Sequence, residues 1–228
     1  MTLKEYVNQE GKSSNGYKRT PLSAAIKNKH ADIKMYLIGH GADLHKAYKE
    51  EFQRGTPLVC ACEKGRFEDV KLLITGFNDV NGSNGNNNNN MTLKEYVNQE
   101  GRTSTGYDRT PLTIAAREEH FQIVKYLIEQ GEADPNIADS VGVNALHLAA
   151  RYTSTNIELI ELLIAHISLD SINKKHMGGY TPLDYAYGNN DSPLRQEIIA
   201  LLRSKGGKAN WHDENGRYVG EGNGDLNQ

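Results

Sequence analysis

The sequence has few of the residues that build disulfide frameworks or metal sites. Its 228 residues include two cysteines and one tryptophan. The cysteines, Cys60 and Cys62, stand two residues apart, and on a helix such side chains point in different directions. They form a poor metal pair, and Cys/His clusters with zinc-like spacing are also missing from the sequence. We therefore expect reduced, buried thiols, no metal and no cofactor.

The chain also lacks a strong charge and long apolar runs. Lys and Arg number 26 against 29 Asp and Glu, which gives a net charge of −3. A nucleic-acid-binding domain usually carries a basic patch and a high pI, whereas the pI here is about 6.2. No apolar run approaches the length of a membrane span, and no apolar core follows Met1 as in a secretory signal. We expect neither nucleic acid nor membrane as a partner, and a cytoplasmic or nuclear location.

A short signature, Thr-Pro-Leu, recurs along the chain. With a degenerate copy at Asn144, successive copies are spaced by 36, 54, 34 and 37 residues. A period near 34 is typical of repeat proteins, in which each unit packs only on its neighbours. Such chains present long surfaces rather than closed pockets, so the pattern favours a binding protein over an enzyme. The copies begin at Thr20, Thr56, Thr110, Asn144 and Thr181.

The residues around each signature resemble the ankyrin repeat. Thr110-Pro111-Leu112 leads to Ala115-Ala116, an apolar helix and Gly131, and Ala145 to Ala150 reads Ala-Leu-His-Leu-Ala-Ala. Five copies cover roughly residues 16 to 210. The resemblance implies an all-α solenoid of stacked helix-turn-helix units with β-hairpin fingers. It also implies a non-catalytic protein–protein interaction module, and the His147 position implies a structural histidine that bonds backbone between neighbouring turns.

The pattern also makes physical sense on its own. Thr caps backbone donors and Pro fits the first helical position. The outer helices carry apolar residues at i, i+3 and i+4, which predicts one stripe against the stack. Glycines after these helices predict a left-handed residue that ends each of them. The stripes are Ile33/Tyr36/Leu37 and Ile123/Tyr126/Leu127, and the glycines are Gly41, Gly131 and Gly206.

Residues 1–11 and 91–101 are identical, and the similarity continues into the following Thr-Pro-Leu, which indicates an internal duplication. Each copy contains a Thr-x-x-Glu capping box and resembles an outer helix, so we interpret it as a half-repeat. The Asn-rich segment 81–90 between them is predicted to be a disordered linker. It either loops out of one continuous stack, which we favour, or tethers two short arrays.

The predicted organisation therefore has four parts. Residues 1–80 hold a half-repeat and repeats 1 and 2, residues 81–90 the linker, and residues 91–210 a half-repeat and repeats 3 to 5. Residues 211–228 form a terminal hairpin and a polar tail, because Asn215-Gly216 is a strong two-residue hairpin signal.

No catalytic set is recognisable in the sequence. Asp213, Asn215 and Gly216 faintly resemble a calcium loop, but Trp211 would then occupy the first ligand position. No serine has an arguable His/Asp partner set. We expect no enzymatic activity. Two functions stay open: a module that binds one or more proteins as a monomer, and an architectural or self-assembling scaffold.

The partner surface is expected on hairpin tips and on the inner-helix positions that stacking leaves free. Aromatic residues and Arg are the types that most often dominate interfaces. We rank Tyr152, Arg151, Arg117, Tyr107 and Tyr180 highest. The other candidates are Glu118, Lys27, Asn28, Glu63 and Lys64 on the helices, with Tyr48 and Phe52 in a long charged connection.

Overall fold

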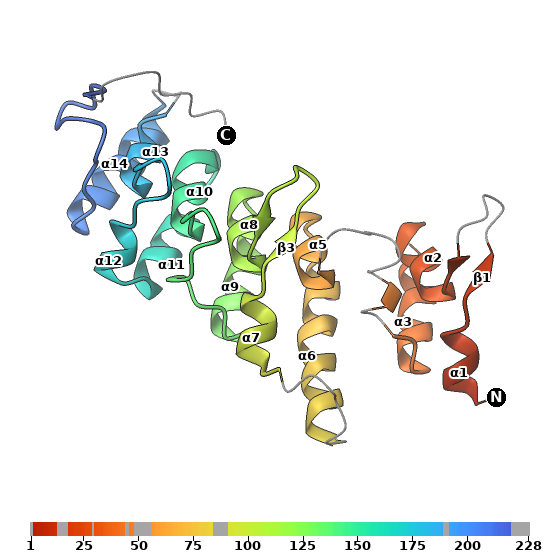
Figure 1. Cartoon of the computed structure of the whole chain (residues 1–228). Coiled ribbons are helices and arrows are strands. Elements are labelled where there is room, and N and C mark those ends of the chain that lie inside the picture. The colour runs from red at the N-terminus through yellow and green to blue at the C-terminus, as the bar shows by residue number, and fades with distance from the viewer. Residues whose placement is uncertain are drawn as a thin grey trace.

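The computed structural model describes residues 2–12, 18–28, 30–43, 46–47, 56–83, 91–188 and 192–219. Five helical pairs follow one another in an elongated stack (Figure 1). The pairs are α2 (Pro21–Lys27) with α3 (Ala31–Gly39), α5 (Pro57–Glu63) with α6 (Phe67–Ser83), α8 (Pro111–Arg117) with α9 (Phe121–Glu129), α10 (Ala145–Tyr152) with α11 (Glu158–His166), and α13 (Pro182–Ala186) with α14 (Pro193–Ser204).

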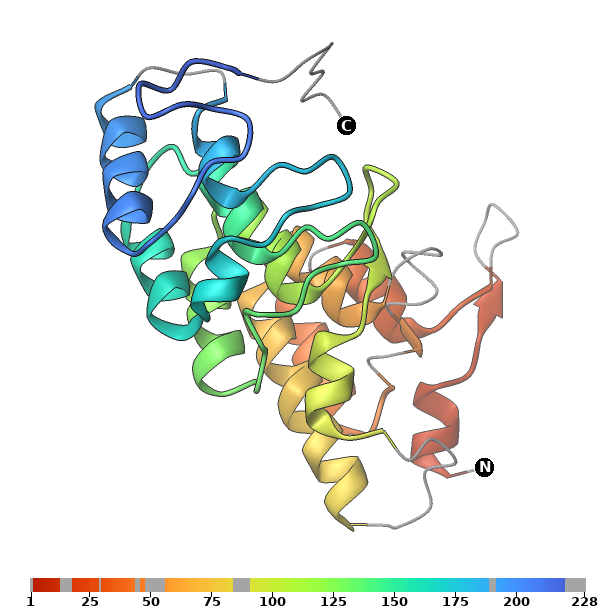
Figure 2. The same ribbon diagram turned by 60° about the vertical axis from the view of Figure 1, so that its left-hand side comes forward.

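Short elements precede or connect these pairs. Three short helices are α1 (Leu3–Val7), α7 (Leu93–Asn98) and α12 (Leu169–Ile172). Strands β1 (Gly11–Lys12) and β2 (Lys18–Arg19) form one antiparallel hairpin, with Gly11 opposite Arg19. Strands β3 (Gly101–Arg102) and β4 (Asp108–Arg109) form its counterpart, with Gly101 opposite Arg109. Hairpins and turns project to one side of the helices (Figure 2), which confirms the expected helical solenoid with hairpin fingers.

The signature threonines start the inner helices as expected. Thr20, Thr56, Thr110 and Thr181 each take extended backbone, and each side chain accepts a hydrogen bond from the N–H three residues on. Proline follows at the first helical position in all four, where its missing N–H costs no hydrogen bond. Asn144 replaces Thr at α10 and caps His147 in the same way.

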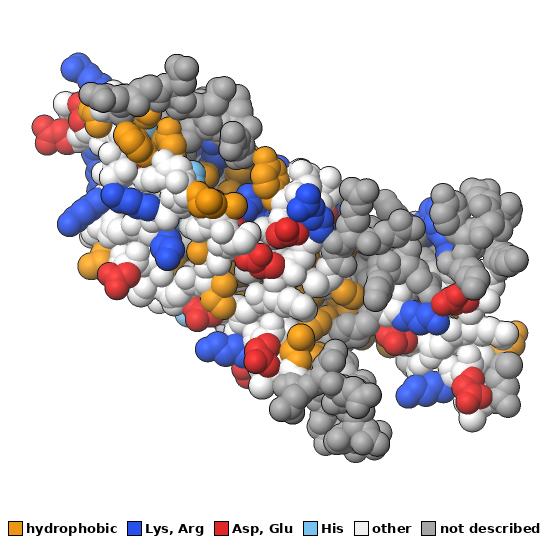
Figure 3. All heavy atoms as spheres, viewed as in Figure 1, with side chains coloured by type: hydrophobic (Ala, Val, Ile, Leu, Met, Phe, Trp, Pro, Cys, Tyr) orange, Lys and Arg blue, Asp and Glu red, His pale blue; other side chains and the backbone are white. Residues whose placement is uncertain are grey.

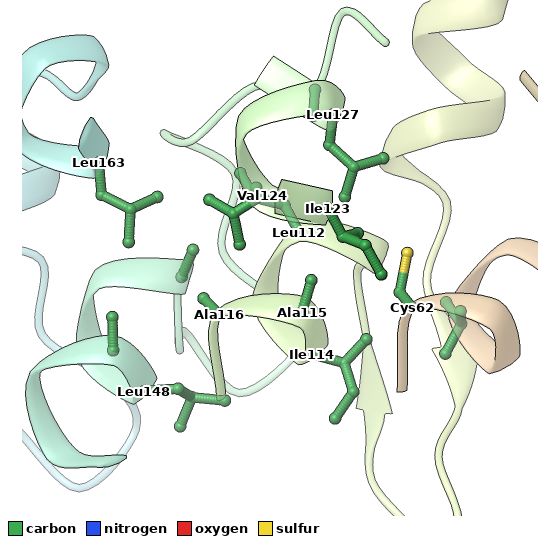
Figure 4. Close-up of a cluster of buried hydrophobic side chains, with 14 of the residues drawn as sticks. Cys62, Leu112, Ile114, Ala115, Ala116, Ile123, Val124, Leu127, Leu148 and Leu163 are labelled. Carbon is green, nitrogen blue, oxygen red and sulfur yellow. The ribbon is translucent and has the colours of Figure 1, made fainter. Parts of the chain in front are cut away.

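The small residues of the inner helices sit at the centre of the stack (Figure 4). Ala115 and Ala116 are fully buried, as is Cys62 in the equivalent position of α5. Helix α8 packs on α5 on one side and on α10 on the other, and α10 packs on α13. Because α5 packs on α8 and α6 on α9, the stack continues from repeat 2 to repeat 3 across residues 84–90, which lie outside the described residues. Helix α6 reaches Ser83 and so enters the predicted linker.

The first repeat is joined less closely to the second. A cavity of about 410 Å³ lies between them, lined by Ile26 of α2 and Phe67 of α6 among others. Lys34 of α3 connects the two repeats through an ion pair with Asp69 of α6.

The interpretation of residues 1–11 and 91–101 as outer half-repeats is wrong. In α1, the Asn8 side chain donates to the Gly41 carbonyl at 2.9 Å and accepts from the Asp43 N–H at 2.7 Å. Asn98 makes the same pair of bonds to Glu132 and Asp134. Asn173 at the end of α12 does so to Gly206 and Lys208. Helices α1, α7 and α12 are therefore equivalent turns before a hairpin, and each clasps the end of its own repeat.

Two details of the turns also differ from expectation. Gly41 and Gly206 take the left-handed conformation, with φ of 84° for both, but after α9 it is Glu132 that does so, with φ of 57°. At the C-terminal hairpin only Gly216 has positive φ, whereas a two-residue turn of the expected type needs Asn215 to share it. The Asp213 carboxylate instead accepts from the N–H groups of Asn215 and Arg217, which gives a longer turn.

Candidate functional site

A cavity of about 580 Å³ opens between the hairpin turns and the inner helices of repeats 3 to 5. Its walls come from the β3–β4 hairpin, the turns at 141–143 and 176–180, and helices α8, α10 and α13. Figure 3 shows apolar and cationic side chains gathered on this face. The lining residues are Thr105, Tyr107, Arg109, Ile114, Arg117, Val141, Val143, Leu148, Arg151, Tyr152, His176, Met177, Gly178, Tyr180 and Tyr185.

The structure brings together the five residues ranked highest from the sequence, since all five line this cavity. Tyr152, at the end of α10, lies between two arginines. The Arg117 guanidinium is 5.1 Å from the centre of its ring and that of Arg151 is 5.6 Å from it. Such contacts hold the guanidinium groups over the ring faces. Tyr152 is still 40% exposed, so a partner has access to it.

The charges of the lining are of one sign. None of the described residues that line the cavity is Asp or Glu. Arg109 is neutralised by a buried ion pair with Asp139, and Arg117 pairs with Glu118. Arg151 has no ion-pair partner within the described part of the chain, and it stands 5.9 Å from the Tyr185 ring. The cavity therefore presents one guanidinium whose charge is not neutralised by a carboxylate.

The fully buried His147 lies behind the lining, with its ring centre 5.2 Å from that of Tyr185 and 6.2 Å from that of His176. The His147 Nδ1 accepts from the Asn144 N–H at 3.2 Å, and its Nε2 lies 3.2 Å from the Tyr180 carbonyl oxygen. Burial lowers the pKa of His147 to about 3, so the ring stays neutral and joins two adjacent turns. This is the structural role that the resemblance implied.

Aromatic rings extend the lining toward the C-terminus. His176 stacks on Tyr180 at 5.4 Å, and Tyr180 lies 6.0 Å from Trp211. A hydrogen bond with Tyr218, together with burial, raises the pKa of Tyr180 to about 12. Tyr180 is thus tied to the last hairpin, whereas Tyr107 at the opposite wall is 43% exposed.

The remaining candidates lie elsewhere. Lys27 and Asn28, at the end of α2, are exposed but lie in repeat 1. The Glu63 carboxylate accepts from the N–H and hydroxyl of Ser104 at 2.9 and 2.6 Å, so it holds the β3–β4 hairpin in place. Lys64 is exposed beside it, with its Nζ 3.9 Å from Glu63. Tyr48 and Phe52 lie outside the described residues.

Sequence reasoning missed several lining residues. His176 and Tyr185 contribute rings to the lining of the cavity, and Arg109 and Val143 form part of its wall. None of the four was among the candidates. Arg109 precedes Thr110 by one residue and His176 precedes Thr181 by five. Their spacing from a signature could therefore have placed both near the hairpins. Tyr185 stands on α13, three residues after Pro182, at the position that Ile114 and Leu148 hold in the two preceding repeats.

Among the described residues there is no cluster of three or more His, Cys, Asp or Glu that could hold a metal ion. In that same part of the chain, no helix combines the length and apolar character needed to cross a membrane. Cys60 and Cys62 are free and buried, and burial raises the pKa of Cys60 to about 11.

The chain belongs to the ankyrin repeat family. Blocks of three ankyrin repeats match residues 2–84, 55–139, 83–175 and 132–214, which together cover most of its length. Ankyrin repeats are generally protein–protein interaction modules.

Several curated proteins are similar to the chain. An ankyrin repeat protein of fowlpox virus is 28% identical over 186 residues, which is 80% of this chain and 46% of that protein. Inversin of Canis lupus familiaris is 28% identical over 204 residues, 87% of this chain and 16% of its own length. Alpha-latrocrustotoxin-Lt1a of Latrodectus tredecimguttatus is 32% identical over 131 residues, 57% of this chain and 7% of the toxin. The chain thus spans less than half the length of these relatives.

Proposed function

We propose that the chain is a non-catalytic binding module that holds a segment of a partner protein in the cavity of repeats 3 to 5. The observation that carries the proposal is the convergence of Tyr107, Arg117, Arg151, Tyr152 and Tyr180 on one cavity of about 580 Å³. Tyrosine and arginine supply much of the binding energy in protein interfaces. Rigid aromatic side chains also lose little conformational entropy on binding.

The charge pattern favours an acidic partner segment. Arg151 lacks an ion-pair partner within the described residues, and the cavity lining contributes no carboxylate of its own. A guanidinium binds a carboxylate through two parallel hydrogen bonds, and a site shielded by rings strengthens that pair. An Asp or Glu side chain of the partner fits beside Arg151, with apolar neighbours against Tyr152 and Tyr107.

Replacing Arg117, Arg151 and Tyr152 together by Ala should weaken binding of the partner more than tenfold, which corresponds to about 1.4 kcal/mol. The melting temperature should change little, because all three side chains are partly exposed. The affinity is measured by calorimetry once a partner is in hand. Unchanged affinity would place the partner elsewhere on the chain.

The matched control is Lys27→Ala with Asn28→Ala. These residues stand ninety positions before Arg117 and Glu118, at the same point of repeat 1, but outside the cavity. The control variant should bind as tightly as the unmodified chain. Equal losses for the two variants would mean that the inner-helix ends of the whole stack, and not this cavity, contact the partner.

A further inference from the structure

The end of the stack at repeat 1 carries large exposed apolar side chains. Leu3 and Tyr6 of α1 are 59% and 64% exposed, and Ile33 and Tyr36 of α3 are 52% and 64% exposed. This corrects the expectation that Ile33 and Tyr36 pack against the stack, since α3 contains no buried residue. The name end face is used below for Leu3, Tyr6, Ile33 and Tyr36.

The duplication supplies an internal comparison for this end face. Each of its residues has a counterpart of the same type ninety positions later, namely Leu93, Tyr96, Ile123 and Tyr126. The local structures also match, because α1 and α7 share the same capping box and the same clasp by Asn8 or Asn98. The same surface therefore occurs twice in one chain.

In the second occurrence the surface is covered by α6. Tyr96 is only 6% exposed and stacks on Phe77 of α6, with ring centres 4.7 Å apart and planes 10° apart. Tyr126 meets Phe67 of α6 edge to face at 5.7 Å. Ile123 is 2% exposed, and α6 packs on both α7 and α9.

Between those two aromatic contacts, Ile74 of α6 approaches the end of α9. Its Cδ1 lies so near Gly131 that a Cβ at that glycine would be 3.2 Å away. Phe67, Ile74 and Phe77 are spaced by seven and three residues, so they lie on one stripe of α6. One helical stripe thus contacts Tyr96 and Tyr126, the counterparts of Tyr6 and Tyr36.

At the end face, the corresponding place beside α1 and α3 holds no described element (Figure 1). A repeat surface that faces water is usually polar, because an apolar one promotes association. The end face keeps instead the apolar residues that its counterpart uses for contact with a helix.

We propose that the end face is a docking surface for an amphipathic helix of a partner protein, with aromatic or aliphatic side chains at the spacing of Phe67, Ile74 and Phe77. The aromatic residue at the third position stacks on Tyr6, and the one at the first position meets the Tyr36 ring by its edge. This surface is separate from the cavity of repeats 3 to 5, so a partner there does not compete with one here.

The test presents such a helix to the end face of the full chain. A second copy of residues 56–90 is fused directly before Met1, which reproduces the order in which those residues precede Met91. The fusion should melt about 4 °C or more above the parent, because covering several large apolar side chains stabilises the docked state. No rise in melting temperature would overturn the proposal.

Two variants make the test specific. Tyr6→Ala with Tyr36→Ala should leave the melting temperature of the parent almost unchanged, because both rings are exposed, yet should remove most of the rise in the fusion. Replacing Phe67 and Phe77 by Ala in the added copy alone should also remove most of the rise in melting temperature. A rise that persists in both variants would show that the added helix binds elsewhere, which also overturns the proposal.

Discussion

Leu127→Ala should lower the free energy of unfolding by about 2–5 kcal/mol, the range for a large aliphatic side chain removed from a packed core. Leu127 is fully buried at the centre of α9 (Figure 4). Helix α9 packs against α6, α8 and α11, so the cavity left by the truncation weakens more than one interface of the stack. The loss is measured by urea unfolding followed by circular dichroism.

The duplication provides the matched control for this variant. Leu37 stands ninety residues earlier at the same point of α3, but it is only half-buried. Leu37→Ala should cost less than half as much as Leu127→Ala, because less apolar surface leaves contact. Equal losses would mean that α3 is packed in solution as closely as α9.

Asp184→Asn should destabilise the C-terminal end by at least about 2 kcal/mol, because hydrogen bonds to a buried charge are among the strong ones. The Asp184 carboxylate is fully buried. It accepts from the Thr181 N–H, the Asn210 N–H and the Trp211 N–H, each at 2.9 Å, and pairs with His212 at 2.9 Å. One carboxylate thus anchors both the start of α13 and the last hairpin.

Trp211 is the only tryptophan, so its fluorescence reports on this end. In Asp184→Asn its emission should respond to urea before the helical signal is lost. Asp170→Asn serves as the control, because that carboxylate is exposed on α12 and its replacement should cost little. If both variants unfold like the parent, Asp184 does not anchor the hairpin.

The same carboxylate gives a pH dependence with a defined sign. Burial alone would raise the pKa of Asp184, but the bonds from Thr181, His212, Asn210 and Trp211 outweigh it and lower the pKa below its ordinary value. Its stabilising contribution is therefore complete above the ordinary Asp range near ~3.9 and is lost as the pH falls through the lower folded value. In Asp184→Asn this part of the acid loss of stability should be missing.

The fold was predictable because its determinants are local. Thr caps, Pro at the first helical position and paired small residues act within one repeat, and the family resemblance fixed how the repeats stack. The ranking of Arg117 and Arg151 followed from the same geometry, since both stand in the last turn of successive inner helices, whereas His176, Tyr185, Arg109 and Val143 were missed. The packing partners of a given residue were not predictable in this way, because they belong to the neighbouring repeat.

The two copies of one sequence show this limit. Tyr6 and Tyr96 lie in identical segments, yet one is 64% exposed and the other 6% exposed. No local pattern distinguishes them, because the difference comes from α6, a helix far from residue 6 along the chain. Likewise, Asp184 and His212 meet across 28 residues and carry no signature that links them.

The asparagine clasps join residues that are far apart in the sequence, so each clasp closes a long loop of chain. Asn8 joins residue 8 to residues 41 and 43, and Asn98 and Asn173 do the same in their own repeats, over sequence separations that differ by at most one residue. A pull on the two ends of the protein meets these side-chain bonds before it reaches the helices between them. The enclosed residues, some 33 in the first repeat, extend to roughly 110 Å only when the helices between the clasped ends unpack as well. We therefore expect the stack to lengthen under load in steps of one repeat.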